Sequence, residues 1–419
     1  MNYRLVPYAQ ISEIDGVTLI DSVVNKTSIK ISDQSLKSEL DELVKNSGCD
    51  TTTSPLERCL HQENFLLSQP ELMQFLTEVQ LLMNRKLLVT IMPTEACNFR
   101  CPYCYERHIP ITMSKQTISQ IKNYISSISE NFETVSIAWF GGEPTLCADT
   151  VLDVSEFIKT LGKEKSFNFI SSMTTNGYLL TKNLFTQFYQ AGVKSYQITL
   201  DGWTHDKTRP LRSGKETLET ILNNLKEISK FSKEDYPFHV TIRHNILKDD
   251  IDFSWYDYLH DIFGDDDRFS ILVRPVGNWG GETVGKLNLL QGSESEQLIL
   301  KHIQYIKKIG MKCANGAQGV FSKICYASYR YSMVFRATGK IEKCTVALDH
   351  PQNLIGYVDY SKGVVLNENA NYQWWHSTLQ EKCFCCKELL TCFNMRCKKK
   401  TLIDGLVDST CSSVSLKIY

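Results

Sequence analysis

The chain lacks the features that mark membrane, secreted and nucleic-acid-binding proteins. No apolar run in its 419 residues approaches the length of a membrane span. The first residues contain neither an apolar core nor a small-residue cleavage site, which argues against a secretory signal. The formal net charge is only -1, so charge gives no reason to expect nucleic acid or an anionic membrane as a partner. Low-complexity tracts and internal repeats are also absent. These absences predict a cytoplasmic globular protein without a membrane or nucleic-acid partner.

Cysteine, in contrast, is abundant, with 15 residues that gather in two places. Without a secretory signal, this number favours metal or cluster ligation over disulfides. The first group has the spacing Cys-x3-Cys-x2-Cys and consists of Cys97, Cys101 and Cys104. Three thiolates on one loop can hold three irons of a [4Fe–4S] cluster and leave the fourth iron open to a small molecule. A structural zinc site that lacks one ligand, or three unrelated buried thiols, are the competing interpretations.

Strand and helix signals alternate from residue 86 to about residue 310. The predicted strands are 86–92, 134–140, 167–173, 196–200, 238–246 and 269–273. The predicted helices are 114–130, 151–161, 182–191 and 217–228. This alternation indicates an α/β fold with a parallel sheet and right-handed crossovers. About six such units fit, which is fewer than the eight of a complete barrel.

Candidate functional residues follow these strands, at the edge where parallel barrels carry their chemistry. Gly141-Gly142-Glu143-Pro144 follows the second strand, and its two glycines let the backbone approach a ligand closely. Exposed backbone carbonyls and the Glu143 carboxylate could accept hydrogen bonds from an ammonium group there. The later strands end in or carry Thr175, Asn176, Asp201, Arg243 and Asn245. His205, Asp206 and Arg209 follow Asp201, and a loop histidine that tethers Asp206 is one interpretation of His205.

The cysteine spacing, the aromatic Tyr105 after it and the downstream Gly-Gly-Glu-Pro resemble the radical SAM superfamily. The resemblance implies a partial (β/α)6 barrel. It also implies a [4Fe–4S] cluster on Cys97, Cys101 and Cys104, whose open iron binds the amino and carboxylate groups of S-adenosylmethionine (SAM). An external one-electron reductant of the flavodoxin or ferredoxin type is then expected. The implied SAM-pocket residues are Gly141, Gly142, Glu143, Pro144, Thr175, Asn176, Asp201 and Arg243.

The second cysteine group lies after residue 311 and resembles the SPASM extension of radical SAM enzymes. That resemblance implies two auxiliary [4Fe–4S] clusters, three clusters in all. One takes Cys383, Cys386, Cys392 and Cys411. The other takes Cys325, Cys344 and Cys397, with Cys313 as the candidate fourth ligand or with an open iron instead. The spacing before Cys397 is x4 where the family usually has x3, and a zinc knuckle is the alternative for the quartet.

The N-terminal segment shows short strands followed by helices. The expected strands are 11–14, 17–20 and 26–31, and the expected helices are 35–44 and 70–83. This order suggests a small winged-helix-like α+β module that resembles the peptide-recognition domains of radical SAM enzymes acting on ribosomal peptides. Such domains pair a leader peptide with an exposed strand edge. A structural cap on the barrel is the alternative. The expected domains are 1–85, 86–310 and 311–419.

The resemblance implies an enzyme that oxidatively crosslinks a ribosomally synthesised precursor peptide, through a thioether or a carbon–carbon bond. A sulfatase-maturating enzyme that generates formylglycine is an alternative. It is disfavoured because Thr345 follows Cys344 where that group typically has an Asp base. Activation of a glycyl-radical enzyme and a non-enzymatic electron-transfer protein are further alternatives.

Overall fold

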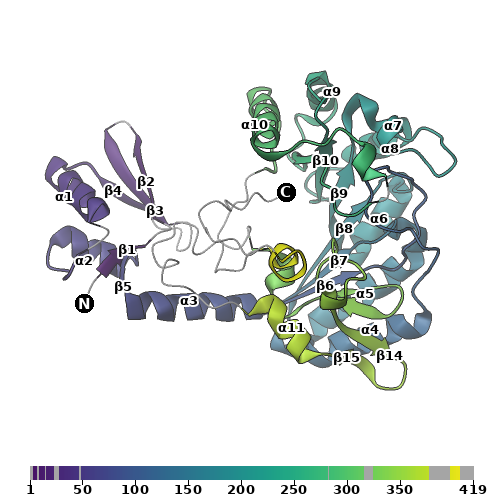
Figure 1. Ribbon diagram of the computed structural model, residues 1–419, viewed down its shortest axis with the longest axis horizontal. Helices are drawn as coiled ribbons and strands as arrows, with labels where there is room; N and C mark the ends of the chain where they lie inside the picture. Colours follow the sequence, from purple (N-terminus) through teal and green to yellow (C-terminus); the bar gives the residue numbers. More distant parts are fainter. Residues whose placement is uncertain are drawn as a thin grey trace. The chain divides into compact units, whose positions relative to one another are not determined.

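The computed structural model describes residues 3–6, 9–14, 16–22, 28–46, 49–281, 283–315, 324–376 and 397–405. The chain forms two compact units (Figure 1). The larger unit contains Arg85–Gly316 and Arg330–Trp374. The smaller unit contains Met1–Asn84, Ala317–Tyr329 and Trp375–Ile418. The candidate site described below lies within the larger unit.

A ten-stranded sheet with the order β11-β10-β9-β8-β7-β6-β12-β13-β14-β15 is the centre of the larger unit. The strands β6 to β11 pair in parallel with their neighbours, which confirms the α/β fold with a central parallel sheet. These strands are β6 (Lys86–Ile91), β7 (Thr134–Trp139), β8 (Asn168–Thr175), β9 (Val193–Thr199), β10 (His239–Ile246) and β11 (Phe269–Pro275).

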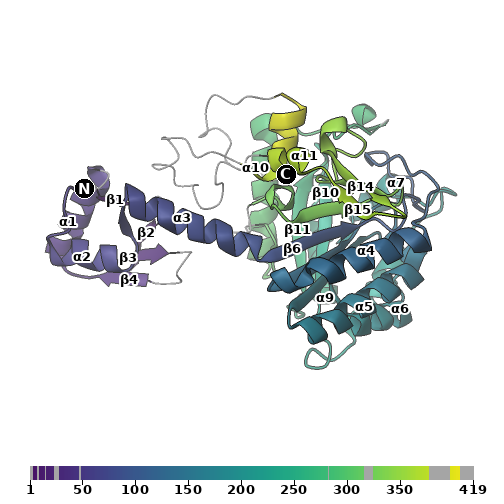
Figure 2. The same cartoon turned by 90° about the horizontal axis from the view of Figure 1, so that it is seen from below.

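Helices follow the parallel strands, and those after β6, β7 and β8 lie side by side on one face of the sheet (Figure 2). Two of these helices begin at a side-chain cap, where Ser114 and Thr181 accept the Thr117 and Leu184 amides. The helices are α4 (Lys115–Ile128), α5 (Ala148–Lys165), α6 (Lys182–Ala191), α7 (His205–Thr208), α8 (Leu218–Ser229), α9 (Ser254–Phe263) and α10 (Gly292–Lys308).

The parallel strands have two chemically different faces. Successive side chains of a strand point to opposite faces, and on β7 and β10 buried and half-buried positions alternate along most of the strand. The buried set is mainly apolar and includes Ile137, Ile198 and Ile242. The half-buried set is mainly polar and includes Ser136, Ser172, Thr174, Gln197, Thr241 and Arg243. Because the helix layer covers one face, the polar set belongs to the opposite, partly open face.

The C-terminal strands extend the same sheet beyond β6. The strand β12 (Ser332–Phe335) runs parallel to β6, and β13 (Lys340–Glu342), β14 (Leu354–Asp359) and β15 (Gly363–Leu366) follow as antiparallel neighbours. The helix α11 (Glu368–Trp375) follows β15. The pairing of β12 with β6 places this segment beside the strand that leads into the first cysteine group.

The smaller unit contains an antiparallel sheet of β2 (Ala9–Ile14), β3 (Val17–Ser22) and β4 (Ser28–Ile31), with β3 in the middle. The strands β1 (Tyr3–Leu5) and β5 (Leu66–Ser68) pair separately. Its helices are α1 (Gln34–Lys45), α2 (Pro55–Gln62) and α3 (Gln69–Asn84). Strands followed by helices were expected here, but β1, α2 and β5 were not.

Candidate functional site

Residues 94–106, here called the cysteine loop, follow β6 and carry Cys97, Cys101 and Cys104. The Cys104 amide donates to the Cys101 carbonyl, and the Phe99 amide donates to the Cys97 sulfur at 3.4 Å. Burial raises the pKa of Cys97 and of Cys104 to about 12, and it also raises the pKa of Cys101. Bare thiolates are therefore disfavoured in this loop, whereas a bound metal would supply the positive charge that removes their protons.

The Gly-Gly-Glu-Pro turn after β7 packs directly against the cysteine loop. Gly142 has a φ of +35°, and a Cβ atom there would lie 2.1 Å from the Ala96 carbonyl oxygen. The Glu143 amide donates to that same oxygen at 2.9 Å. Only glycine fits this close approach of two backbones. Gly142 is therefore needed for the contact between the two loops, in addition to any role in binding a ligand.

The Glu143 carboxylate is buried and accepts four hydrogen bonds from the protein. Its donors are the amide and hydroxyl groups of Thr145, the Thr175 hydroxyl and the Asn176 amide, at 2.6 to 3.0 Å. Three of these bonds go to Oε1 and one goes to Oε2, so Oε2 keeps an acceptor position for a ligand. Glu143 therefore joins β7 to the end of β8.

Asn176 connects the end of β8 to the cysteine loop. Its Nδ2 group donates to Asn98 Oδ1 at 2.8 Å, and its Oδ1 accepts the Tyr178 amide. Asn98 lies directly after Cys97, yet the sequence analysis had not singled it out. Thr175 and Asn176, predicted from the strand-end motif, thus lie in one network with Glu143.

Tyr103, between Cys101 and Cys104, is held by three side chains from other segments. Its hydroxyl donates to Asp201, which follows β9. It accepts hydrogen bonds from Arg209 Nη1 at 2.8 Å and from Asn245 Nδ2 at 3.3 Å. Asp201 also accepts from the Thr208 hydroxyl and the Asn245 amide. The predicted residue Asp201 therefore anchors the cysteine loop.

His205 and Asp206 organise the backbone around this anchor. His205 Nδ1 accepts the Asp201 amide at 3.1 Å, and its Nε2 lies 3.1 Å from the Thr217 hydroxyl. Asp206 accepts the amides of Thr217 and Leu218 at the start of α8. His205 thus ties Asp201 to Thr217 and does not hydrogen-bond Asp206, so the suggested tether of Asp206 by His205 is wrong.

Arg243 lies on the polar face of β10, and Arg274 lies on β11 in register with Asn245. Arg243 Nε donates to Asn245 Oδ1 at 2.7 Å. Burial lowers the pKa of both arginines, and the charge of Arg243 contributes to lowering the pKa of Arg274 to about 10. Two positively charged guanidinium groups that repel each other favour the binding of an anion at this end of the sheet.

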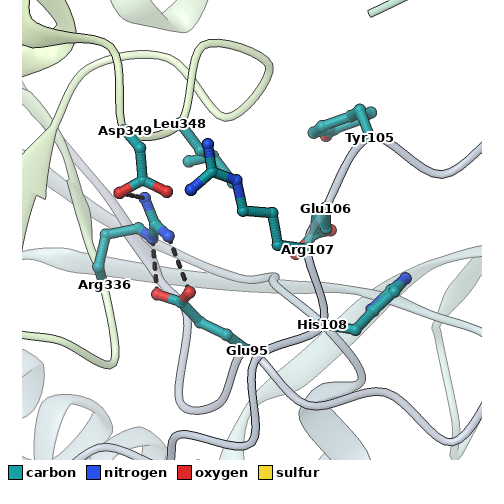
Figure 3. Close-up of a pocket in the computed structure, with 8 residues that line it drawn as sticks. All are labelled: Glu95, Tyr105, Glu106, Arg107, His108, Arg336, Leu348 and Asp349. Carbon is teal, nitrogen blue, oxygen red and sulfur yellow. Dashed lines mark hydrogen bonds and ion pairs between the residues drawn. The ribbon is translucent and has the colours of Figure 1, made fainter. Parts of the chain in front are cut away.

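A small cavity of about 30 Å³ lies where the cysteine loop meets the β12–β13 hairpin (Figure 3). Arg336 forms a two-pronged ion pair with Glu95, with both contacts at 2.8 Å, and also contacts Glu342 and Asp349. Glu106 accepts the Gly142 amide at 2.8 Å, and burial raises its pKa to about 7. The cavity has room for a water molecule but not for an organic substrate.

The loop after β11 also closes on the cysteine loop. A Cβ atom on Gly281 would lie 2.4 Å from the Cys104 carbonyl oxygen, and the Thr283 hydroxyl donates to the Pro102 carbonyl. The sequence analysis did not assign this loop a role at the site. The cysteine loop is thus surrounded by segments that follow β7, β8, β9 and β11.

Residues 91–261, which include all of these strand ends except that of β11, match the Radical SAM superfamily model. The chain contains a radical SAM domain. The matched span begins at the last residue of β6 and ends within α9, so it covers the cysteine loop, the Gly-Gly-Glu-Pro turn and the Asp201 anchor. This superfamily consists of enzymes.

Curated relatives match about a third of the chain. The GTP 3′,8-cyclase of Campylobacter jejuni subsp. doylei is 34% identical over 142 residues, which are 33% of this chain and 41% of the relative. The chain thus spans about two fifths of the length of the curated relatives it matches first.

Two solved structures share the fold. One is native anSMEcpe with bound AdoMet and Cp18Cys peptide, at 14% identity and a TM-score of 0.51, covering 73% of this chain and 88% of that chain. The other is Streptococcus suis SuiB bound to S-adenosylmethionine, at 14% identity and a TM-score of 0.50, covering 93% and 94%. At this identity the similarity shows the fold alone.

The cysteines outside the radical SAM domain are only partly described. Cys313 and Cys344 lie in the larger unit, and Cys325 and Cys397 lie in the smaller one. The Cys344 turn is fixed by Asn353, whose side chain bonds to both the amide and the carbonyl of Cys344. Cys383, Cys386, Cys392 and Cys411 lie outside the described residues. Both auxiliary clusters stay predictions.

The described residues contain neither a compact metal site nor a membrane-spanning helix. No three His, Cys, Asp or Glu side chains among them are arranged around a single metal ion. A [4Fe–4S] cluster does not need that arrangement, because each thiolate binds a different iron. No helix in the described part of the chain is long and apolar enough to cross a membrane.

Proposed function

We propose that this protein is a radical SAM enzyme that cleaves SAM and oxidatively modifies a ribosomally synthesised peptide, forming a thioether or carbon–carbon crosslink. The observation that carries the proposal is the attachment of the cysteine loop to the ends of β7, β8 and β9. Glu143 and Asn176 hold one side of the loop, and Asp201 holds the other. The half-buried polar side chains of the sheet lie on the face opposite the helix layer.

The residues of the loop fit a [4Fe–4S] cluster. The three thiols share one loop and influence one another electrostatically. Arg209 Nε is buried with no hydrogen-bond acceptor among the described residues, so a donor is available at the site. When bound, a reduced cluster with SAM on its open iron supplies a 5′-deoxyadenosyl radical, which abstracts a hydrogen atom from the substrate.

The residues around the loop suggest how SAM binds. The backbone carbonyls of Gly141 and Gly142, together with Glu143 Oε2, which accepts one protein hydrogen bond, can accept from its ammonium group. The Arg243 guanidinium, which uses only Nε for its bond to Asn245 among the described residues, can pair with the SAM carboxylate. Thr175, Asn176 and Asp201 act mainly by holding the loops in place.

A peptide substrate is favoured by the domain order and by the peptide-bound structure with the same fold. In the smaller unit, β2 and β4 are the outer strands of their sheet within the described residues, so each offers an edge for leader pairing. The winged-helix-like assignment of this unit is part of the proposal. Two auxiliary clusters would accept the electron left on the substrate, and a flavodoxin- or ferredoxin-type protein would supply electrons.

Two measurements test the proposal. The reconstituted, reduced protein should convert SAM to 5′-deoxyadenosine under anaerobic conditions, and no product would contradict the radical SAM assignment. The short peptide encoded beside the gene should then be co-expressed with the enzyme and analysed by mass spectrometry. The peptide should lose two hydrogens per modified site, and it should not fragment across the linked span. An unmodified peptide alongside intact SAM cleavage would favour a protein substrate such as a sulfatase.

The peptide-binding role of the smaller unit has its own test. Removal of residues 1–84, which ends at the boundary between the two units, should abolish peptide binding in a titration. SAM cleavage should persist, because no residue of the proposed SAM site lies in that segment. Unchanged peptide affinity in the truncated protein would favour a structural cap.

A further inference from the structure

Arg209 is a buried cation at the cysteine loop that the proposed SAM chemistry does not use. The residue is 9% exposed. The Asp201 carboxylate reaches its guanidinium through the Tyr103 hydroxyl, but the buried Nε–H has no acceptor among the described residues. A buried donor without an acceptor is costly, so a hydrogen-bond partner is expected there.

The backbone places Arg209 against the loop. The Arg100 amide donates to the Pro210 carbonyl at 3.0 Å, and the Arg212 amide donates to the Asn98 carbonyl at 2.7 Å. Phe99 and Leu211 form a short antiparallel bridge between the same two segments. The segment after α7 is therefore docked on the first half of the cysteine loop, with Arg209 at its start.

The guanidinium contacts residues on both sides of Cys101. Nη1 donates to the Tyr103 hydroxyl at 2.8 Å, and Cζ lies 5.7 Å from the centre of the Phe99 ring. Phe99 and Tyr103 each lie two positions from Cys101. The cation therefore lies beside the part of the loop that carries Cys101.

We propose that Arg209 is a positioning residue that donates its Nε–H to a sulfur atom of the SAM-binding cluster and holds its charge beside that cluster. This inference rests on the proposed function. A thiolate-bound cluster is an anion, so it supplies the missing acceptor for Nε–H and places further negative charge beside the cation. A nearby cation and a hydrogen bond to sulfur favour the reduced, more negative state, so Arg209 raises the reduction potential.

The test is a reductive titration of the full-length, reconstituted protein followed by electron paramagnetic resonance. The signal of the SAM-binding cluster is identified by its change on addition of SAM, which separates it from any auxiliary cluster. At the wild-type midpoint potential, R209Q should lower the ratio of reduced to oxidised cluster about tenfold, equivalent to about 59 mV for a one-electron couple. An unchanged ratio would overturn the inference.

A further variant is the matched control. Arg268→Gln removes another buried arginine, which is paired with Asp266 in the loop before β11, and should leave the midpoint unchanged. A shift in this variant as large as that of R209Q would contradict the role of the Arg209 charge.

A conservative variant covers the case in which R209Q does not retain iron. Arg209→Lys keeps the charge but lacks the fixed Nε–H, so its midpoint should fall in the same direction by a smaller amount. An Arg209→Lys midpoint potential equal to that of the wild type would contradict the proposed hydrogen bond to sulfur. If the wild-type protein shows no SAM-sensitive signal, the proposed function itself fails, and this outcome is distinct from an unshifted R209Q.

Discussion

Asn176 Nδ2 donates a 2.8 Å hydrogen bond to Asn98 Oδ1 and so joins the end of β8 to the cysteine loop. Asn98→Ala removes this bond but keeps the Asn98 carbonyl that accepts the Arg212 amide. Since one such bond contributes about 1 kcal/mol, we expect SAM cleavage to fall roughly fivefold with the fold intact. Chromatographic measurement of 5′-deoxyadenosine checks this. Asn131→Ala, which alters an exposed amide beyond α4, is the matched control, and equal rates in both variants would contradict the prediction.

Glu143→Gln should destabilise the larger unit. The glutamine keeps the shape of the side chain but turns one oxygen into an NH2 group, which then faces a donor from Thr145, Thr175 or Asn176. Loss of hydrogen bonds to a buried charge predicts a decrease of about 2 to 3 kcal/mol in the free energy of unfolding. Denaturant unfolding followed by circular dichroism measures it. Glu156→Gln, on the exposed side of α5, should change stability by less than about 0.5 kcal/mol.

The arrangement of the sheet could be predicted because its signals are local. Alternating apolar residues predicted β7 and β10, and the 3.6-residue period predicted α6 with its observed bounds, 182–191. The helices α9 and α10 were not predicted. The short α2 was also missed, although Ser54 and Glu57 form a capping box at its start.

The site could be predicted only where short motifs carry it. The cysteine spacing and Gly-Gly-Glu-Pro pointed to the loop and to Glu143, and the sequence at the end of the third predicted strand pointed to Thr175 and Asn176. Arg336 could not be found in this way, because it lies 241 positions from Glu95 and contacts it only through the pairing of β12 with β6. The hydrogen bonds from Thr175 and Asn176 to Glu143 were equally hidden, since they depend on the register between β7 and β8.

His205 should make stability depend on pH in the acidic range. Burial lowers its pKa from 6.5 to about 3, and the nearby charge of Arg209 contributes to this decrease. Protonation of Nδ1 would also remove the acceptor of the Asp201 amide. The unfolded chain then binds the proton first, so this stabilisation is complete above pH 6.5 and is lost as the pH falls towards 3. Between pH 7 and pH 5 the loss should be about 2 kcal/mol.

The comparison with His205→Gln isolates this contribution. The variant should be less stable than the wild type at pH 7, and the difference should narrow at pH 5 because glutamine does not titrate. Unfolding midpoints in denaturant at both pH values give the result. If the difference in stability between the two proteins is the same at pH 7 and pH 5, His205 does not account for the pH dependence.

Arg336→Met should strongly destabilise the larger unit, because it leaves Glu95 and Glu342 buried without their cation. Breaking a buried ion pair in this way costs about 3 to 5 kcal/mol. Thermal unfolding of the reconstituted protein is the measurement. Lys340→Met, which removes the half-exposed partner of Asp349, should cost less than about 1 kcal/mol. Similar losses in both variants would mean that the buried pairs contribute no more than the surface pair.

Cys344→Ala separates the proposed auxiliary chemistry from SAM cleavage. Cys344 lies after β13, outside the matched radical SAM residues, and its backbone is held by Asn353, so alanine should leave the turn intact. If Cys344 binds an auxiliary cluster, the variant should still form 5′-deoxyadenosine but should no longer crosslink the peptide, because the substrate electron has no acceptor. Product mass spectra and iron content measure both effects. Cys147→Ala, a change to a half-buried thiol near the Pro93 carbonyl, should retain both activities. Crosslinking by Cys344→Ala at the wild-type rate would remove Cys344 from the set of cluster ligands.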